Sequence, residues 1–263
     1  MRTLSAALSV VLTLGLLIAG VPASADAPCE RPLRVGHEDW PPYEMPRDDG
    51  LYGINGKILR AIADQLGCRI VWRERPWQRI LDGLKRGSID VTGTATIKAD
   101  RQGFVRYSEP YTQFVAELFV GDRIDEDYDS LRAFLDDGHD VAVVNGYSYG
   151  GSADGLLQNE AYSSQIFRMY AASDAVRAVA AGRIAALIGN RRAVPYMARS
   201  QGVEARISRT GVVVQDEPAA FMFSRETVSV SLLARVNEAI AILRRDGIID
   251  RITEEYSLRV SSR

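Results

Sequence analysis

Short apolar runs alternate along the chain with longer segments in which apolar residues recur every three or four positions. In the first part of the chain this pattern predicts strands at residues 33–36, at 69–72 and from 89, and helices over 58–66 and 77–84. Asn55 is the expected N-cap of the first helix, and Gly67 and Gly87 are expected to end the two helices. The order strand–helix–strand–helix–strand predicts a parallel sheet with right-handed crossovers.

The same pattern recurs later in the chain. Strands are expected at residues 140–144, 164–169 and 184–188. The segment after Ser148 has the pattern of a short helix, and Ser173 is expected to cap a helix that Gly182 ends. Two further helices are expected near the C-terminus, over residues 232–243 and 252–256. Two small α/β lobes are therefore the predicted architecture.

Polar and aromatic side chains follow the predicted strands, where ligands bind in open α/β sheets. The residues at these ends are His37, Glu38, Asp39, Trp40, Trp77, Thr94, Thr96, Arg101, the segment 145–150 and Asn190. Aromatic rings, hydroxyls, one arginine and an amide would converge there if the two lobes face each other. The sequence therefore predicts a cleft that closes on a small ligand.

The N-terminus has the three parts of a secretory signal peptide. Arg2 is followed by an almost wholly apolar stretch, residues 4–21, and then by Ala-Ser-Ala at 23–25. Cleavage is expected after Ala25, with Ala27 as the alternative position. A membrane anchor is the competing interpretation, but no basic flank follows the apolar stretch. No later segment is apolar enough to span a bilayer.

Charge and composition narrow the class of protein only modestly. The formal net charge of −2 becomes about −3 without Arg2, so nothing indicates nucleic-acid binding. The mature chain of roughly 235 residues is long enough for one large domain or two small ones. The expected product is a soluble exported protein of ordinary globular composition.

Cys29 and Cys68 are the two cysteines of the chain. In an oxidising compartment pairing is the default, and each cysteine immediately precedes a predicted strand. If these strands are parallel neighbours, both cysteines lie at the same edge of the sheet. A bridge closing about 40 residues would stabilise the fold by roughly 3–4 kcal/mol on the chain-entropy model. Two free thiols are the alternative.

Residues 146–150 read Gly-Tyr-Ser-Tyr-Gly and match G-x-S-x-G, the nucleophile elbow of α/β-hydrolases. A hydrolase triad needs a histidine after the serine, but His37 and His139 both precede Ser148. We therefore expect Ser148 to donate a hydrogen bond and the glycine-flanked turn to attract an anion through its N–H groups. A plain helix-capping serine is the alternative.

Several runs of the sequence resemble the solute-binding proteins of polar amino-acid ABC transporters. These runs are "LRVGHEDWPPYEM", "GINGKILRAIADQLG", "GSIDVTGTATIKADR", "YSEPY", "VAAGRIAALIGN" and "LLARVNEAIAILRRDGIIDRITEEY". The resemblance implies a two-lobed type II periplasmic binding protein. Each lobe would hold a mostly parallel sheet flanked by helices, and two hinge strands would join the lobes. The implied division is a signal peptide over 1–25, a first lobe of 28–113 plus 217–263, and a second lobe of 114–216.

The resemblance also implies how the ligand carboxylate is held. Thr96 and Arg101 match the hydroxyl and the arginine that grip it, and Ser148 matches a second hydroxyl contributed by the other lobe. An arginine fork pairs with a carboxylate through two hydrogen bonds, and a closed cleft strengthens that pair. Thr94 matches a residue whose carbonyl faces the ligand α-ammonium. For Arg101 the alternative is an ordinary surface arginine.

Aromatic residues are expected to surround the rest of the ligand. Trp40 and Trp77 match the residues that sandwich it, since indole faces stack on side chains or hold cations. His37 matches a position that often contacts the ligand side chain. Tyr147, in the same turn as Ser148, is also expected to bind the ligand. For both tryptophans the alternative is ordinary core packing.

One position departs from the family pattern. Where the family usually carries an aspartate that pairs with the ligand ammonium, this chain has Asn190. A neutral amide holds a cation more weakly. Either Asp39 or Glu38 supplies the missing charge, or the ligand is not an ordinary α-amino acid. A third possibility is that Asn190 only donates a hydrogen bond and specificity is unchanged.

The leading hypothesis is a periplasmic binding protein without cofactor or metal. It would act as a monomer, capture a small carboxylate such as an amino acid, and deliver it to an ABC-transporter membrane permease. One alternative is a periplasmic dehydratase of cyclic acids such as prephenate or arogenate, on the same fold, with Glu38 or Asp39 as general acid. The other is a sensory partner that reports the ligand to a membrane receptor.

Overall fold

The computed structural model describes residues 29–261 of the 263-residue chain, with side chains described up to Tyr256. The expected signal peptide, residues 1–25, lies outside the described residues. Among the helices of the described part, none combines the length and the apolar character needed to cross a membrane.

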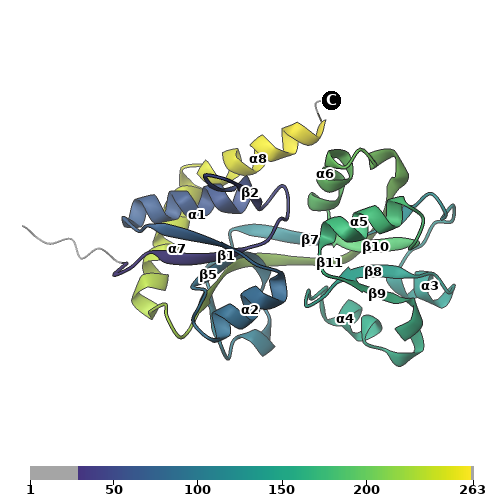
Figure 1. Cartoon of the computed structure of the whole chain (residues 1–263), viewed down its shortest axis with the longest axis horizontal. Helices are drawn as coiled ribbons and strands as arrows, with labels where there is room; N and C mark the ends of the chain where they lie inside the picture. Colours follow the sequence, from purple (N-terminus) through teal and green to yellow (C-terminus); the bar gives the residue numbers. More distant parts are fainter. Residues whose placement is uncertain (1–28, 262–263) are drawn as a thin grey trace, which may run out of the picture.

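The first lobe is built on three parallel strands at one end of the main sheet (Figure 1). These are β1 (Leu33–His37), β4 (Ile70–Glu74) and β5 (Val91–Thr96), with β1 between the other two. Helices α1 (Gly53–Leu66) and α2 (Trp77–Lys85) connect them. A short hairpin, β2 (Met45–Arg47) and β3 (Gly50–Tyr52), lies before α1. The predicted parallel sheet is confirmed, although β4 and β5 begin slightly later than expected.

The second lobe repeats this arrangement at the other end of the sheet. Its parallel strands are β8 (Val141–Val144), β9 (Ile166–Met169) and β10 (Ala186–Asn190), with β8 in the middle. Its helices are α3 (Leu131–Asp136), α4 (Gly151–Leu157), α5 (Ala172–Ala180) and α6 (Ala193–Ser200). The short helix expected after Ser148 is therefore present as α4.

Two long antiparallel strands join the lobes. Strand β7 (Thr112–Gly121) pairs with β10 in the second lobe, and β11 (Ile207–Ser224) pairs with β7 along most of its length and then with β5 in the first lobe. The pairing of β11 shifts register at three places, so this strand bends where it passes between the lobes. The two-lobed fold with two connecting strands is confirmed.

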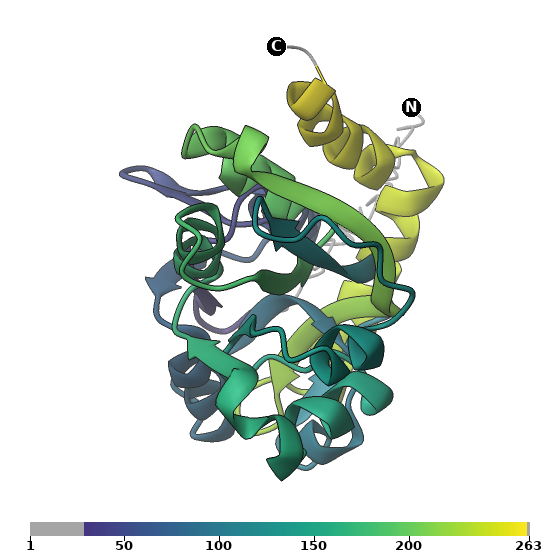
Figure 2. The same cartoon turned by 90° about the vertical axis from the view of Figure 1, so that its right-hand side faces the viewer.

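The chain ends on the first lobe. Short strand β6 (Val105–Tyr107) pairs with the end of β11. Helices α7 (Val230–Arg245) and α8 (Ile248–Ser261), yellow-green to yellow in Figures 1 and 2, then pack against α1. Three short 3₁₀ segments complete the described elements: Ala99–Arg101, Glu160–Gln165 and Glu204–Arg206.

Two expected helix caps are wrong, and the reason is tertiary. Helix α1 begins at Gly53, so Asn55 lies inside its first turn, fully buried, with its side chain bonded to other elements. Helix α5 begins at Ala172, and Ser173 lies inside it rather than before it. The expected stop at Gly67 is confirmed, because this glycine adopts a left-handed φ of 67°.

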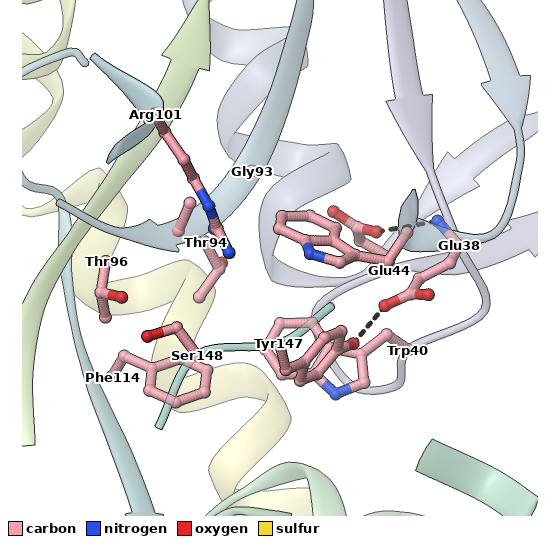
Figure 3. A pocket seen from close by; sticks show the side chains of 12 residues that line it. Glu38, Trp40, Glu44, Gly93, Thr94, Thr96, Arg101, Phe114, Tyr147 and Ser148 are labelled. Atoms are coloured by element: carbon pink, nitrogen blue, oxygen red, sulfur yellow. Dashed lines mark hydrogen bonds between the residues drawn. The ribbon is translucent and has the colours of Figure 1, made fainter. Parts of the chain in front are cut away.

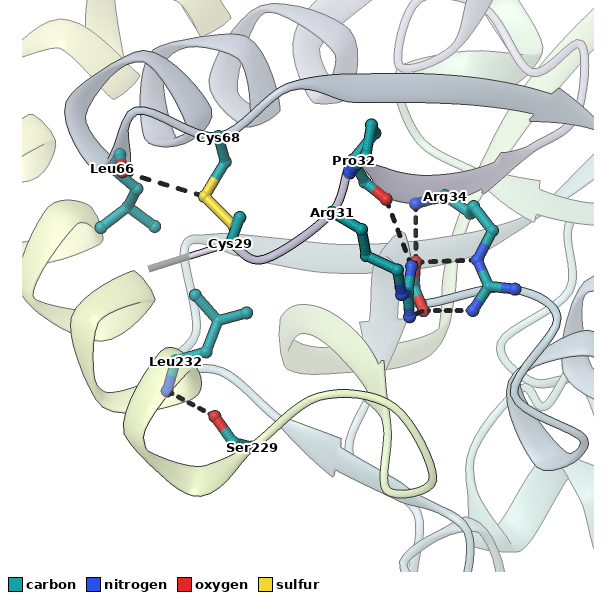
Figure 4. Close-up of a disulfide and its surroundings, with 9 residues drawn as sticks. Cys29, Arg31, Pro32, Arg34, Leu66, Cys68, Ser229 and Leu232 are labelled. Carbon is teal, nitrogen blue, oxygen red and sulfur yellow. Dashed lines mark hydrogen bonds and ion pairs between the residues drawn. A yellow bond between two sulfur atoms is a disulfide. The ribbon is translucent and has the colours of Figure 1, made fainter. Parts of the chain in front are cut away.

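The disulfide between Cys29 and Cys68 is present (Figure 4). Strands β1 and β4 are parallel neighbours, with Leu33 opposite Ile70, so both cysteines lie at the same edge of the sheet. Their Cα atoms are 5.4 Å apart, a normal separation for a bridge. The bridge ties the N-terminal segment to the end of α1.

Candidate ligand-binding cleft

A cavity lies between the two lobes at the carboxyl ends of β1 and β5. Seven of the residues expected from the sequence line it: Trp40, Trp77, Thr94, Thr96, Arg101, Tyr147 and Ser148. Glu38, Glu44 and Phe114 also line it, and of these only Glu38 was considered from the sequence. Parallel strands present their carboxyl ends at one sheet edge, which brings residues from distant parts of the chain together.

Arg101 and Trp77 reach across the cleft to the same backbone atom. Arg101 is 9 % exposed and donates from its guanidinium to the carbonyl oxygen of Gly146 at 3.2 Å. The indole N–H of Trp77 donates to that oxygen at 3.1 Å, and the guanidinium lies 5.8 Å from the centre of an indole ring of Trp77. Both side chains belong to the first lobe and Gly146 to the second. The arginine fork is therefore held inside the cavity rather than in solvent.

Thr94 has a strained backbone, supported by a buried hydrogen-bond network. Its φ of 42° lies in the left-handed region, which β-branched residues rarely adopt. The Thr94 hydroxyl donates to the Asn55 side-chain oxygen at 2.8 Å, and the Thr94 N–H donates to the Tyr111 hydroxyl at 2.8 Å. The Asn55 amide in turn donates to a Glu44 carboxyl oxygen at 2.9 Å. This network holds the end of β5 in the conformation that faces the cavity.

Glu38 and Glu44 place two carboxyl groups at the cavity without a cation beside them. The Glu38 N–H donates to Glu44 at 3.1 Å, and no ion pair among the described side chains, residues 29–256, includes either glutamate. Burial raises the pKa of Glu38 to about 7 and the pKa of Glu44 to about 8. Strongly perturbed carboxyls in a cleft are typical of functional sites.

Tyr147 projects from the second lobe between the two tryptophans. Its ring meets Trp40 edge-on at 6.5 Å between centroids and Trp77 edge-on at 5.7 Å. Its hydroxyl donates to the Glu38 carboxyl group, as the dashed line in Figure 3 shows. Burial raises the pKa of Tyr147 well above its usual range, so the phenol stays protonated and remains a donor.

Ser148 lines the cavity, but its hydroxyl donates to the Asp154 carboxylate at the start of α4. The Tyr149 N–H donates to the other oxygen of Asp154 at 2.8 Å. His139 contacts the Tyr128 hydroxyl at 2.6 Å, and His37 lies at the end of β1 in the other lobe. The serine thus has an acid beside it and no histidine, which does not make a hydrolytic triad.

Three expected residues lie outside this cavity. His37 is 4 % exposed and packs edge-on against Trp72 at 6.2 Å, and its burial lowers its pKa. Asp39 is exposed. The side-chain oxygen of Asn190 accepts from the N–H groups of Arg192 and Ala193 at 2.9 and 3.2 Å, which caps the start of α6. The amide therefore has a structural partner in its own lobe.

A second, mostly apolar cavity lies next to the first, inside the second lobe. It shares Trp40, Phe114 and Tyr147 with the first cavity, and Asn190 is one of its few polar residues. Throughout residues 29–261, no group of three or more histidine, cysteine, aspartate or glutamate side chains could hold a metal ion. The site is built for hydrogen bonds, charge and aromatic contact.

Two bacterial proteins illustrate the similarity in sequence. The probable amino-acid-binding protein YxeM of Bacillus subtilis is 20 % identical over 218 residues, which cover 82 % of this chain and 79 % of that protein. A probable histidine-binding protein of Campylobacter jejuni is 23 % identical over 240 residues, or 90 % of this chain and 89 % of that protein.

Solved structures share the fold at similarly low identity. A histidine kinase sensor domain similar to periplasmic binding proteins has a TM-score of 0.75 at 22 % identity, covering 86 % of this chain and 96 % of that one. An ancestral arginine-binding protein bound to glutamine has a TM-score of 0.73 at 24 % identity, covering 87 % and 98 %. An ancestral amino acid-binding protein, a precursor of cyclohexadienyl dehydratase, has a TM-score of 0.70 at 22 % identity, covering 85 % and 94 %.

The match to a protein family spans nearly the whole described chain. The model of the bacterial extracellular solute-binding proteins, family 3, matches residues 33–259. This range contains both lobes, both connecting strands and every residue that lines the cleft. The chain therefore belongs to family 3 of the bacterial extracellular solute-binding proteins.

Proposed function

We propose that this protein binds a zwitterionic amino acid between its lobes and delivers it to the membrane permease of an ABC transporter. The observation that carries the proposal is the charge distribution of one cavity. Arg101 and Thr96 lie on one side of it, and Glu38 and Glu44 lie on the other (Figure 3). A carboxylate and an ammonium group on one small molecule match this arrangement.

Each end of the cavity suits one charge of the ligand. Arg101 offers two parallel N–H donors to a carboxylate, and Thr96 adds a hydroxyl. The Ser148 hydroxyl lies beside them but donates to Asp154, so it would have to turn away from Asp154 to donate to the ligand. At the other end, a ligand ammonium would favour the ionised form of Glu38, because an opposite charge lowers a carboxyl pKa. Glu38 rather than Asp39 is then the substitute for the charge that Asn190 lacks. Trp40 and Trp77 form aromatic walls between the two ends.

The names of similar proteins support an amino acid as the ligand class. Relatives are described as amino-acid-binding and histidine-binding proteins, and one structural neighbour was solved with glutamine. We propose lobes of residues 28–113 plus 217–263 and 114–216, which close about β7 and β11. Export by the segment 1–25 into the periplasm, and action as a monomer without a cofactor, belong to the same proposal.

The test begins with a thermal-shift screen of amino acids and small carboxylates, since a ligand at 100 times its Kd adds about 2.7 kcal/mol of stability. Calorimetry with the best ligand then compares the wild type with Arg101→Ala, which should bind about 30-fold more weakly or worse, because removing one partner of a buried charge pair costs about 2–5 kcal/mol. Arg86→Ala, at an exposed position, is the matched control. Equal affinity in Arg101→Ala would refute the assignment.

A second candidate is a dehydratase acting on a cyclohexadienyl acid. It is favoured by one observation, a cavity-lining Glu38 whose pKa of about 7 suits a general acid near neutral pH. A structural neighbour described as a dehydratase precursor shares the fold. Incubation with prephenate or arogenate tests the idea: product formation that is lost in Glu38→Gln would support the enzyme, and no product would exclude it.

A further inference from the structure

Tyr147 stands between two cavities of different chemistry. The first holds Arg101 and the two glutamates and has a volume of about 40 Å³. The second has a volume of about 10 Å³ and is lined mainly by apolar side chains of the second lobe, such as Val144, Leu187 and Met197. Tyr147 lines both, together with Trp40 and Phe114. The phenol ring is therefore part of the wall that separates a polar compartment from an apolar one.

This tyrosine is held at both ends. Its hydroxyl donates to Glu38 in the opposite lobe, and its backbone N–H donates to the carbonyl of Val144 at 3.1 Å. Gly146 directs it, with a φ of 79° that a larger residue would adopt only with strain. A Cβ at position 146 would also lie 2.0 Å from the side chain of Gln78. The position of the ring thus follows from the turn that carries it and from its partner across the cleft.

Tyr147 limits how far an apolar side chain can extend from Arg101 into the second lobe. A third cavity beside Arg101, of about 320 Å³, is lined mainly by polar residues such as Lys98, Asp154 and Arg168. A cavity of about 150 Å³ accepts a benzene molecule, and the first two compartments are each far smaller than that. A ligand whose carboxylate pairs with Arg101 and whose ammonium faces Glu38 leaves little room in these two compartments for a long apolar side chain. We infer that Tyr147 is a specificity-determining residue, which excludes amino acids with long apolar side chains from this site. The inference rests on the proposed amino-acid function.

The apolar compartment indicates which ligands a smaller residue at 147 would admit. Without the phenol ring the two compartments join, and a side chain could extend from the polar end toward Val144, Leu187 and Met197. Burial of apolar surface against these residues favours apolar side chains over polar ones. The ligands gained should therefore be amino acids such as leucine and phenylalanine.

Calorimetry with a graded set of ligands tests the inference. The ligands are glycine, L-alanine, L-norvaline, L-leucine, L-phenylalanine and L-arginine, and the proteins are the wild type, Tyr147→Phe, Tyr147→Leu and Tyr147→Ala. In the wild type, affinity should fall at least tenfold between L-alanine and L-norvaline. The longest apolar side chain that binds should grow as residue 147 becomes smaller, with at least a tenfold gain for L-leucine in Tyr147→Ala. Tyr147→Phe should keep the wild-type order of affinities, because the ring remains.

The outcomes separate this inference from the function on which it rests. Tyr170→Ala, at a side chain that is 80 % exposed, is the control and should match the wild type. If the wild type binds L-leucine or L-phenylalanine as tightly as L-alanine, or if Tyr147→Ala weakens every ligand by the same factor, the inference is wrong while amino-acid binding stands. If no amino acid binds any of the proteins, the proposed function fails and the inference fails with it. Should Tyr147→Ala not fold, Tyr147→Leu gives the same comparison.

Discussion

The first lobe buries carboxyl groups in two places, and they behave in opposite ways. Asp90, just before β5, has a fully buried side chain that pairs with Arg31 and Arg34, each at 2.7 Å, and accepts from the Thr227 hydroxyl at 2.6 Å. Figure 4 shows the two arginines near the disulfide. Burial alone would raise the pKa of Asp90, but these hydrogen bonds outweigh it and hold the pKa well below its usual range.

Glu44 is buried and Glu38 half-buried at the opposite end of the same sheet, and neither is paired with a cation. Burial therefore dominates and raises the pKa of both groups. A carboxylate that serves only the fold has its own cations, because burying an unpaired charge is costly. Glu38 and Glu44 lie beside a cavity and have no cation of their own. A positively charged group of a ligand that enters the cavity would favour their ionised forms. A carboxyl group that lacks a partner cation, more than burial itself, therefore marks the candidate ligand site.

The strongest predicted effect is a loss of stability at Asp90, which is paired with two arginines. Asp90→Asn should lower the free energy of unfolding by about 3–5 kcal/mol, because two partly buried arginines lose their partner. Urea denaturation followed by circular dichroism measures this. Asp82→Asn is the control, since Asp82 makes only an exposed contact with Arg86 at 4.0 Å and should change stability by less than about 0.5 kcal/mol. A loss below about 1 kcal/mol in Asp90→Asn would mean that the cluster is not a major contributor to stability.

A second effect is expected on the pH dependence of the free energy of unfolding, through Glu44, which has no partner cation. Glu44 has a pKa of about 8 in the folded protein against 4.5 for an ordinary glutamate, so the folded state binds the extra proton between these values. Its contribution to stability is complete below pH 4.5 and is lost as the pH rises through about 8. Between about pH 5 and pH 8 the free energy of unfolding should therefore decline by about 3 kcal/mol less in Glu44→Gln than in the wild type.

Chemical denaturation at several pH values tests this prediction on the wild type, Glu44→Gln and the exposed control Glu204→Gln. The control should follow the wild-type curve. A wild-type stability that rises between pH 5 and pH 8, with no flattening in Glu44→Gln, would show that Glu44 is ionised in the folded protein.

A smaller effect is expected on ligand affinity. If a ligand ammonium pairs with ionised Glu38, binding competes with protonation of a group whose pKa is about 7. Affinity for the best amino acid should then rise about tenfold from pH 6 to pH 8 and level off above that. Calorimetry should show a weaker and nearly flat profile for Glu38→Gln. An affinity that is constant over this range in the wild type would place the ammonium elsewhere.

The smallest effect is expected at Asn190. The side-chain oxygen of this residue accepts from two N–H groups at the start of α6, and an aspartate can do the same at a helix N-terminus. Asn190→Asp should therefore change affinity for the best amino acid by less than about threefold, or about 0.6 kcal/mol. A gain of tenfold or more would mean that residue 190 reaches the ligand ammonium directly and that Glu38 is not its substitute.

Local pattern predicted most of the regular elements. The strands of both lobes have short apolar runs, the helices have apolar stripes, and glycines such as Gly67 end them. These features depend on neighbours in the sequence, which is why they can be predicted without the fold. The residues of β7 and β11 could not be assigned in the same way, because their pairing joins segments almost a hundred residues apart. The hairpin of β2 and β3 was not predicted either.

Local patterns were enough to predict most of the groups that line the cleft, although His37, Asp39 and Asn190 were expected there too and lie outside the first cavity. Arg101, Thr96, Trp40 and Trp77 were expected in the cleft because parallel strands present their carboxyl ends at one edge, and all four line the cavity. The pairing of Cys29 with Cys68 followed from the same reasoning about neighbouring strands.

How the cleft groups are paired and charged depends on contacts that appear only in the folded protein. Asn55 was expected to cap a helix and instead links Thr94 to Glu44, and the side-chain oxygen of Asn190, a residue expected near the ligand, accepts from two N–H groups at the start of α6. Tyr147 reaches Glu38 from the other lobe. In each case, burial and hydrogen-bond partners depend on which side chains meet between different helices and strands. The charge state of a carboxyl group depends in turn on its burial and on its hydrogen-bond partners.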